Sequence, residues 1–195
     1  MGNNPSNTIL PAAAGCFRET PYPLICKDEA MCPKAYGTCP QPVMKLLRWG
    51  CDREMADRIC CYNRHDAEGQ GYFQEMAEFL EELEKGKEIT FYDSVTGKPL
   101  FIAPRGRTME EFKKESISHG WPSFRDAEVV WSNVRCLADS GESISTSGTH
   151  LGHNLPDERG NRYCINLVSV AGRCPPPPPP PLPTPRSRSL SLSCD

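Results

Sequence analysis

The sequence of 195 residues contains no apolar run that approaches the length needed to cross a membrane as a helix. Its first residues also lack the positively charged segment and apolar core of a secretory signal. We therefore expect no transmembrane segment and a cytoplasmic location, with an organelle as the alternative. The opening MGNNPS fits a myristoylation pattern loosely, with Gly2 and Ser6 at the required offset. A single acyl chain would give only marginal membrane binding.

A strong excess of charge of one sign is also missing. The chain has 22 lysines and arginines and 25 aspartates and glutamates, which leaves a net charge of −3. Partners such as nucleic acids or anionic membrane surfaces are recognised largely through an excess of positive charge. The composition therefore gives no reason to expect a nucleic-acid partner.

Cysteine, by contrast, is abundant and unevenly distributed. Of the 11 cysteines, seven lie in the first 61 residues: Cys16, Cys26, Cys32, Cys39, Cys51, Cys60 and Cys61. They are consistent with disulfides, with metal binding, with a redox relay, or with simple packing as small apolar side chains. The spacings on either side of Cys32, with five and six intervening residues, differ from the two to four of common zinc knuckles. The spacing alone does not decide among these alternatives.

Composition divides the chain into four parts. We expect a flexible tail over residues 1–15, a cysteine-rich and partly helical extension over 16–86, a compact domain over 87–172 and a disordered tail over 173–195. Within the extension, apolar residues recur at helical spacing over 72–85, which predicts an amphipathic helix: Phe73, Met76, Ala77, Leu80 and Leu83.

The C-terminal tail is dominated by proline. Seven consecutive prolines occupy residues 175–181. Proline fixes φ and removes the amide donor, so this tract favours a polyproline II conformation with no core of its own. The sequence PPLP at residues 180–183 is similar to ligands of WW-type domains, which makes such a domain a possible partner. The alternative is a tail without a partner.

The domain over 87–172 has the pattern of a mainly β fold. The segments ITFY at 89–92 and PLFI at 99–102 flank a Thr-Gly turn and predict a hairpin. Thr108 and Glu111 form a capping box that predicts a short helix through about residue 116. Further strands are expected near 128–137, 150–152 and 163–170. Several short strands with turn signals between them favour an antiparallel β domain.

The most reactive side chain in that domain is predicted to be Cys164. It lies in an apolar, strand-like run in which alternate residues share a face, so Arg162, Cys164 and Asn166 are expected to project together. A thiol reacts as the thiolate, and a neighbouring cation lowers its pKa. The alternative is that Cys164 is an inert core residue.

Three motifs occur in order: GWPSF at residues 120–124, HLGH at 150–153 and RYCIN at 162–166. Their sequence, order and spacing resemble the methionine-R-sulfoxide reductase family, and the resemblance covers about residues 91–172. It implies a small antiparallel domain with two sheets. It also implies the reduction of methionine sulfoxide, free or in proteins, to methionine.

The resemblance also implies roles for individual residues. Cys164 would attack the sulfoxide sulfur and become a sulfenic acid. The remaining residues would bind the substrate or handle the sulfoxide oxygen. Trp121 would hold the substrate methyl group, and Phe124 would also bind the substrate. His150, His153 and Asp157 would position and protonate the oxygen, and Arg162 and Asn166 would flank the thiolate and orient the substrate. Histidine suits proton transfer because it titrates close to neutral pH.

This chain departs from the family pattern at the positions of two zinc-binding CxxC pairs. Asp93, Thr96, Ile144 and Ser147 stand there, and a structural zinc site needs four sulfur or nitrogen ligands. We therefore expect no metal and no other cofactor in this domain.

A second departure concerns turnover. His119 stands where many members of the family have the resolving cysteine. Cys136, Cys60 and Cys61 are the favoured substitutes, with Cys51 and Cys174 as further candidates, and a thioredoxin-like dithiol is the expected reductant.

We therefore hypothesise a zinc-free methionine-R-sulfoxide reductase with Cys164 as its nucleophile. The alternative is an inactive reductase-like domain in a cysteine-rich metal-binding or scaffold protein. A third hypothesis is a relay of thiols that exchanges disulfides without a sulfoxide substrate.

Overall fold

The computed structural model describes residues 22–174 of the chain. Several predictions lie outside the described residues: the tail over 1–15, the myristoylation pattern, nearly all of the proline-rich tail, and the PPLP segment. Within 22–174, no helix is long and apolar enough to cross a membrane.

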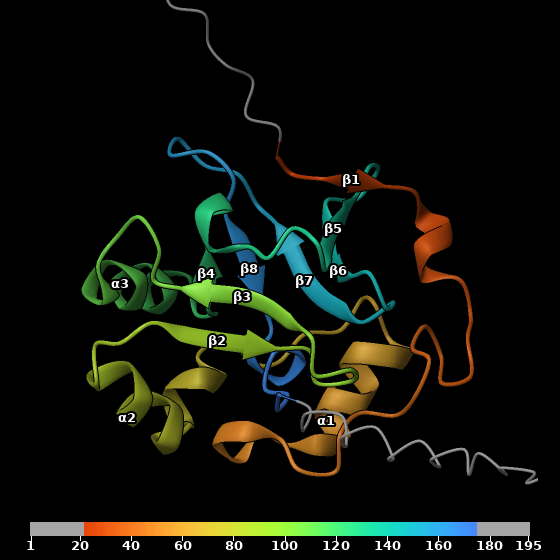
Figure 1. The fold of residues 1–195 in the computed structure, drawn as a ribbon, viewed down its shortest axis with the longest axis horizontal. Helices are drawn as coiled ribbons and strands as arrows, with labels where there is room; N and C mark the ends of the chain where they lie inside the picture. The colour runs from red at the N-terminus through yellow and green to blue at the C-terminus, as the bar shows by residue number, and fades with distance from the viewer. Residues whose placement is uncertain (1–21, 175–195) are drawn as a thin grey trace, which may run out of the picture.

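The described residues form a sheet-rich fold with eight strands in two sheets and a few helices (Figure 1). The larger sheet has the order β1 (Ile25–Cys26), β5 (Val134–Leu137), β6 (Glu142–Ser145), β7 (His150–Asn154), β8 (Tyr163–Ile165) and β4 (Ser123–Phe124). The smaller sheet is the hairpin of β2 (Ile89–Tyr92) and β3 (Pro99–Ala103). Neighbouring strands are antiparallel except β1 and β5, which are parallel. The expected two-sheet, mainly antiparallel arrangement is therefore present, with one parallel edge strand added.

The helices are short and connect or cover the sheets. The α-helices are α1 (Arg53–Asp57), α2 (Ala77–Glu84) and α3 (Met109–His119), and a π-helical turn (Arg58–Tyr62) follows α1. Single 3-10 turns occupy Asp28–Met31, Arg48–Gly50, Tyr72–Glu75, Asp126–Glu128 and Leu167–Ser169. The capping box at Thr108 begins α3, which extends three residues beyond the expected end and stops at Gly120 with φ of 84°.

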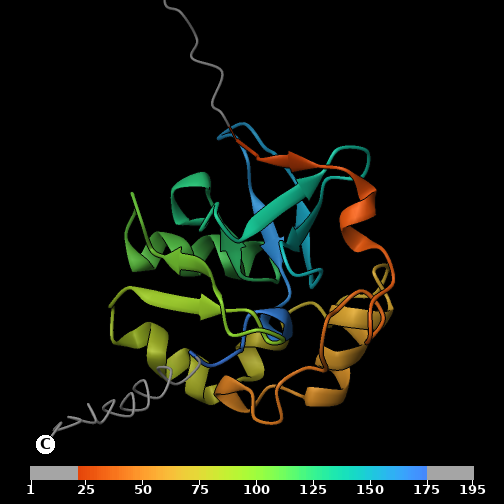
Figure 2. The same ribbon diagram turned by 45° about the vertical axis from the view of Figure 1, so that its right-hand side comes forward.

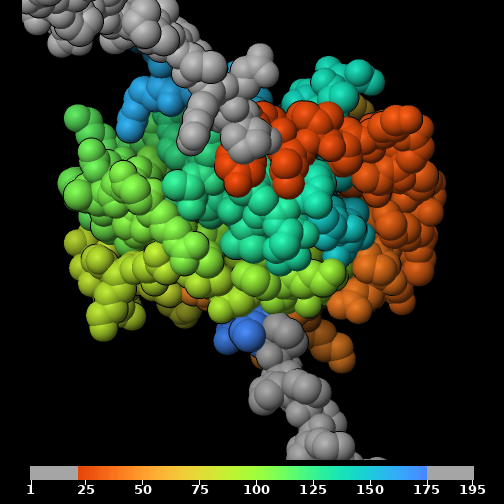
Figure 3. Space-filling view, turned by 45° about the horizontal axis from the view of Figure 1, so that its top comes forward, coloured from red at the N-terminus to blue at the C-terminus, as the bar shows by residue number. Residues whose placement is uncertain are grey.

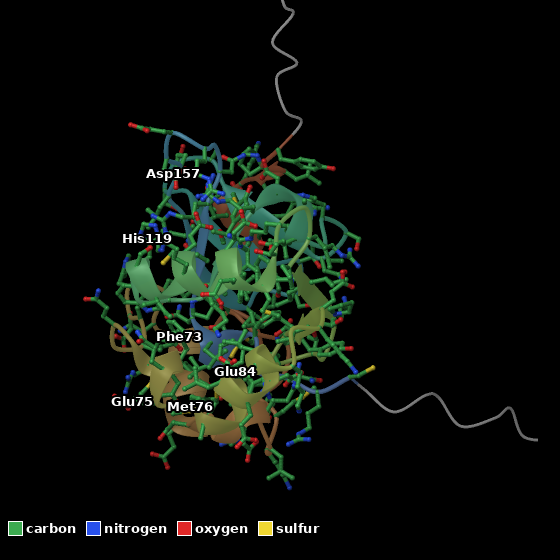
Figure 4. The ribbon with its side chains drawn as sticks, turned by 90° about the vertical axis from the view of Figure 1, so that its left-hand side faces the viewer. Phe73, Glu75, Met76, Glu84, His119 and Asp157 are labelled. Atoms are coloured by element: carbon green, nitrogen blue, oxygen red, sulfur yellow. A yellow bond between two sulfur atoms is a disulfide. The ribbon has the colours of Figure 1, made fainter. Side chains whose placement is uncertain are left out.

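The helix expected over 72–85 is interrupted. A 3-10 turn ends at Glu75, Met76 leaves helical geometry with φ −87° and ψ 89°, and only then does α2 begin. Figure 4 labels Phe73 and Met76 beside this break. The change of helical phase buries Phe79 rather than Leu80. The expected continuous stripe was therefore wrong in its middle.

The cysteine-rich extension and the domain over 87–172 share one hydrophobic core. Trp49 and Phe79 pack with tilted rings whose centroids are 4.7 Å apart, and the ring centroid of Phe79 lies 6.0 Å from that of Phe91 of β2. Figure 2 shows the extension passing from β1 around the edge of the sheet to lie beneath it. Residues on both sides of residue 86 therefore pack into the same core.

The two segments where the reductase family has its zinc ligands lie around Asp93 and around Ser147. A hydrogen bond from Thr149 to Asp93 links them here. The fully buried carboxylate of Asp93 accepts hydrogen bonds from the amide of Val95 (2.9 Å) and from the hydroxyls of Thr96 (2.7 Å) and Thr149 (2.9 Å). Burial raises the pKa of Asp93, against the effect of these donors. The contact between Asp93 and Thr149 links the β2–β3 hairpin to the start of β7.

The cysteines of the extension differ in pairing and in burial. Cys39 and Cys61 form a disulfide, and Cys51 and Cys60 are buried in the core. Cys32 is exposed. Of the four alternatives considered for these cysteines, disulfide bonding and packing in the core are therefore both present in this segment.

Candidate active site

Cys164 is positioned by the alternation of β8. Tyr163 and Ile165 are fully buried in the core, whereas Cys164 between them is partly accessible on the opposite face. In the antiparallel pair with β7, Cys164 lies directly opposite His153. Side chains opposite each other in such a pair have Cβ atoms about 5 Å apart, so the thiol and the imidazole are neighbours.

A bulge in β7 brings the second histidine to the same side. Residues three apart in a regular strand face opposite sides of the sheet. Here the β6–β7 register shifts between Ser143 and Ile144, which pair with Gly152 and His150 and leave one extra residue in β7. The rings of His150 and His153 consequently meet edge to face with centroids 5.7 Å apart.

The glycine of HLGH is required by the neighbouring strand. Gly152 has φ of 153°, and a Cβ at this position would lie 2.0 Å from the carbonyl oxygen of Cys164. Any larger residue would push β7 away from β8 and separate His153 from Cys164. The motif therefore encodes both the histidines and the close approach of their strand.

Five of the predicted site residues line one cavity of about 290 Å³: Trp121, His150, His153, Cys164 and Asn166. Gly152 and Leu155 complete the sheet side. Residues 64–67 of the cysteine-rich extension form the remaining wall. Such a volume lies at the lower end of the range for small-molecule pockets, so it suits one side chain or a small ligand.

The wall formed by residues 64–67 was missed from the sequence. The segment is held in place by Glu68, whose buried carboxylate accepts hydrogen bonds from the amides of Leu167 (2.8 Å) and Val168 (3.0 Å). These two bonds also turn the backbone after β8, where a longer strand was expected. No periodicity or motif in residues 61–68 indicates that the segment lines a cavity, because the residues that bind Glu68 lie about 100 positions away in the sequence.

Glu68 also positions two predicted site residues. Its carbonyl oxygen accepts a hydrogen bond from the indole of Trp121 (3.2 Å), and its amide donates to Oδ1 of Asn166 (3.0 Å). Asn166 in turn donates to the carbonyl of Leu151 (3.1 Å). Burial raises the pKa of the Glu68 carboxyl to about 7. The side chain of Asn166 is thus engaged in holding the cavity wall against the sheet.

A chain of buried charges orients His150. Its Nδ1 atom lies 2.7 Å from Oε1 of Glu142, and Glu142 also accepts hydrogen bonds from Nε (3.0 Å) and Nη2 (2.7 Å) of Arg64. Burial acts to raise the pKa of Glu142, but the hydrogen bonds from His150 and Arg64 outweigh it and the pKa is lowered. Glu142 is therefore ionised at neutral pH, so Nδ1 of His150 is the donor.

His153 has a different environment. Burial lowers its pKa, and the neighbouring His150 lowers it further, although Glu142 acts in the opposite direction. A histidine with a lowered pKa is mainly neutral at pH 7. The two imidazoles therefore differ: one is anchored by a carboxylate, and the other faces Cys164 across the strand pair.

The electrostatics of Cys164 differ from the expected lowered pKa. Burial raises the pKa of its thiol, while the guanidinium of Arg162 opposes this rise through its charge and a hydrogen bond. Arg162 is itself buried, and within the described residues its Nε and Nη1 atoms have no hydrogen-bond partner. Its Nε lies 3.5 Å from Asp157 in an ion pair. The predicted grouping of Arg162 with Cys164 is present, but the predicted sign of the net pKa shift was wrong.

The opposing effects of burial and of Arg162 on the pKa of Cys164 predict how the reactivity of its thiol depends on pH. Alkylation of Cys164 by iodoacetamide is expected to become fast only above the ordinary pKa of cysteine, because the thiolate is the reacting form. Replacing Arg162 by methionine should move the midpoint of the alkylation rate to still higher pH, since it removes the charge that favours the thiolate. Peptide mapping by mass spectrometry would measure the rate at Cys164.

The exposed Arg159, which pairs with Glu115, offers a matched control for that variant. Arg159→Met removes the same charge and should leave the alkylation profile of Cys164 unchanged. An unchanged profile in Arg162→Met as well would contradict the assigned role of Arg162.

Three predicted site residues do not line the cavity: Arg162, which lies beside Cys164 as described above, Phe124 and Asp157. Phe124 is fully buried and stacks on Phe101 with centroids 4.3 Å apart, so the structure places it in the core and not at the cavity. Asp157 is exposed and forms an ion pair with Arg125 (2.8 Å), which holds its pKa far below the usual range. A carboxyl with so low a pKa stays ionised at neutral pH, which argues against Asp157 as a proton donor.

The predicted resolving cysteines also lie away from the cavity, where Cys164 is the one cysteine among the described lining residues. Cys61 is already paired with Cys39. Cys136 and Cys60 are fully buried, and burial raises the pKa of both, that of Cys136 to about 11. None of the three is a ready partner for an oxidised Cys164 in this conformation.

His119, which stands at the family's resolving position, ends α3 on the side of the molecule that carries Asp157 (Figure 4). Its ring lies close to the carboxylates of Glu115 and Asp157. Both carboxylates are neutralised by arginines, Glu115 by Arg107 and Arg125 and Asp157 by Arg125. This cluster is therefore an ion-pair network with little capacity left for a cation.

Compared with protein-family models and with curated proteins, the chain matches none of them.

Proposed function

We propose that this chain reduces methionine-R-sulfoxide to methionine, with Cys164 as the nucleophile. The observation that carries the proposal is the convergence of five side chains on one cavity: Cys164, His150, His153, Trp121 and Asn166. Three separate motifs supplied these residues. The resemblance of the sequence to the reductase family supplies the R configuration and the reductase-like identity of the fold.

The chemistry of the cavity supports this reaction. The thiolate of Cys164 attacks the sulfoxide sulfur while the sulfoxide oxygen takes up a proton. Oxygen is transferred to the cysteine sulfur, methionine leaves as the thioether, and Cys164 becomes a sulfenic acid. The sulfoxide is reduced by two electrons and the cysteine is oxidised by two, so the step balances.

The surrounding residues have distinct roles in that step. Arg162 stabilises the thiolate, which would satisfy part of its unpartnered guanidinium. His150 and His153 line the cavity near the place of the sulfoxide oxygen. His153 can donate its ring N–H to that oxygen, whereas His150, whose ring is fixed by the bond from Nδ1 to Glu142, can donate from Nε2 only in its doubly protonated form. Trp121, fixed by its bond to the carbonyl of Glu68, supplies an apolar surface for the substrate methyl group.

Regeneration requires a second thiol. Because Cys164 is the one cysteine among the described cavity residues, we propose that an external dithiol of the thioredoxin kind reduces the sulfenic acid. Two thiols of that reductant become a disulfide, one water is released, and Cys164 returns to the thiol.

Purified chain should be assayed with the separate R and S sulfoxides of a blocked methionine, using dithiothreitol as reductant. Turnover of the R form alone is the expected result. Turnover of the S form alone, or of neither form by a folded protein, would overturn the proposal. The second outcome would favour a scaffold or metal-binding role for the cysteine-rich segment.

A further inference from the structure

A second, larger hollow of about 620 Å³ adjoins the Cys164 cavity. The two share three lining residues, Arg64, His65 and His153, so the hollow begins at the rim of the cavity. We call it the acidic groove and define it by those three residues together with Lys27, Asp28, Glu29, Glu142 and residues 137–140.

The walls of the acidic groove come from segments far apart in the sequence. One wall is the exposed turn Lys27–Glu29 after β1, and the other is the turn between β5 and β6 around Asp139. Figure 3 shows the first described residues packed directly against the strands of the larger sheet. The parallel pairing of β1 with β5 fixes these walls side by side.

The charge of the acidic groove is predominantly negative. Four carboxylates stand against two cations, Lys27 and Arg64. Arg64 is fully engaged by Asp28 (2.6 Å) and Glu142 (2.7 Å). The carboxylates of Glu29 and Asp139 are exposed and available to a partner.

From this continuity and charge we infer that the acidic groove binds the polypeptide that flanks a methionine sulfoxide and favours lysine or arginine beside it. The inference rests on the proposed function and specifies its substrate as a sulfoxide within a polypeptide that carries basic neighbours. The cavity of about 290 Å³ has room for the oxidised side chain, and the adjoining hollow gives the flanking chain a path away from it. Opposite charges across an exposed groove accelerate association and fade as salt is added.

The test uses three short peptides with one methionine sulfoxide, flanked on both sides by lysine, by glutamate or by glycine. We expect kcat/KM for the lysine peptide to exceed that for the glutamate peptide by about tenfold at low salt, with most of the difference in KM. The ratio should shrink in 0.5 M salt and should fall to about twofold or less in the double variant Glu29→Gln with Asp139→Asn.

A matched control removes the same two charges elsewhere. Glu78 and Glu81 are exposed residues of α2 outside the groove, so Glu78→Gln with Glu81→Gln should keep the full ratio. Equal kcat/KM for the three peptides, or a ratio that survives the groove variant, would overturn the inference.

A binding measurement separates failure of the groove from failure of the reaction. Fluorescein-labelled versions of the same peptides are titrated with the Cys164→Ser chain, which needs no turnover. Tighter binding of the lysine peptide, lost in the groove variant, would support the groove even if no sulfoxide were reduced. Equal binding of all three peptides would overturn the groove even if the blocked amino acid were reduced.

Discussion

Cys164→Ser is expected to abolish sulfoxide reduction, with at least a thousandfold loss of kcat. A serine hydroxyl has almost the same size but does not ionise near neutral pH, so the group that attacks the sulfoxide sulfur is lost. The loss should be the same with dithiothreitol and with a protein dithiol, because the defect precedes regeneration. The measurement is methionine formation from the blocked R-sulfoxide under single-turnover and steady-state conditions.

A control for this variant is Cys32→Ser. Cys32 is exposed, and within residues 22–174 its thiol donates to the carbonyl of Glu29 in its own turn, so its replacement should leave kcat unchanged. Folding of Cys164→Ser is checked by its thermal transition, which should match the parent within a few degrees since Cys164 lies on the cavity side of β8. Activity above about 1% of the parent in a folded Cys164→Ser would reject the assignment of the nucleophile.

Glu142→Ala is expected to damage both activity and stability. It leaves Nδ1 of His150 and the guanidinium of Arg64 without their shared buried acceptor. Breaking a buried ion pair by removing one partner lowers the free energy of unfolding by about 3–5 kcal/mol. Because Arg64 keeps its ion pair with Asp28, we expect a decrease of about 3 kcal/mol. A misoriented histidine should lower kcat/KM by about a hundredfold.

The loss in stability has a defined pH dependence. The pKa of Glu142 is lowered in the folded state, so its stabilising contribution is present above the pKa of an unfolded glutamate, about 4.3, and is lost as pH falls through the lower folded value. Urea unfolding of parent and Glu142→Ala should differ most at pH 6–7, and the difference should shrink below pH 4.

The exposed pair of Glu88 and Arg105 supplies the comparison for Glu142→Ala. Glu88→Ala removes an ion pair of similar geometry at the surface and should leave both activity and unfolding unchanged. A Glu142→Ala chain with parental stability and parental kcat/KM would show that the buried chain from Arg64 to His150 has no functional role.

Some features of the fold follow from local sequence. The ITFY and PLFI hairpin, the capping box at Thr108 and the strands around Cys164 were predicted because their signals lie within a few residues of one another. The placement of Cys164 on the face opposite Tyr163 and Ile165 follows from strand alternation alone. Local periodicity failed at Met76, where the backbone breaks between two helical turns.

The candidate site could be predicted only in part. The cavity residues contributed by HLGH, GWPSF and RYCIN could be predicted, because each of these compact motifs contains at least one of them. Phe124 was misplaced because its neighbour relations depend on packing: in a strand of two residues it turns into a core of aromatic rings, where it contacts Phe91, Phe101 and Phe112. The ion pair of Asp157 was not foreseen because Arg125, its partner, is 32 positions away.

By itself, the sequence pointed to Cys164 as the candidate nucleophile, to the two histidines and to the strand that presents Cys164, since each depends on spacing along the chain. Only the tertiary structure decided what encloses them. The wall at residues 64–67, its anchoring by Glu68, and the pairing of Glu142 with both Arg64 and His150 join segments that local patterns do not connect. The same holds for the net pKa of Cys164, because desolvation depends on how deeply the folded chain buries the thiol and not on the residues beside it in the sequence.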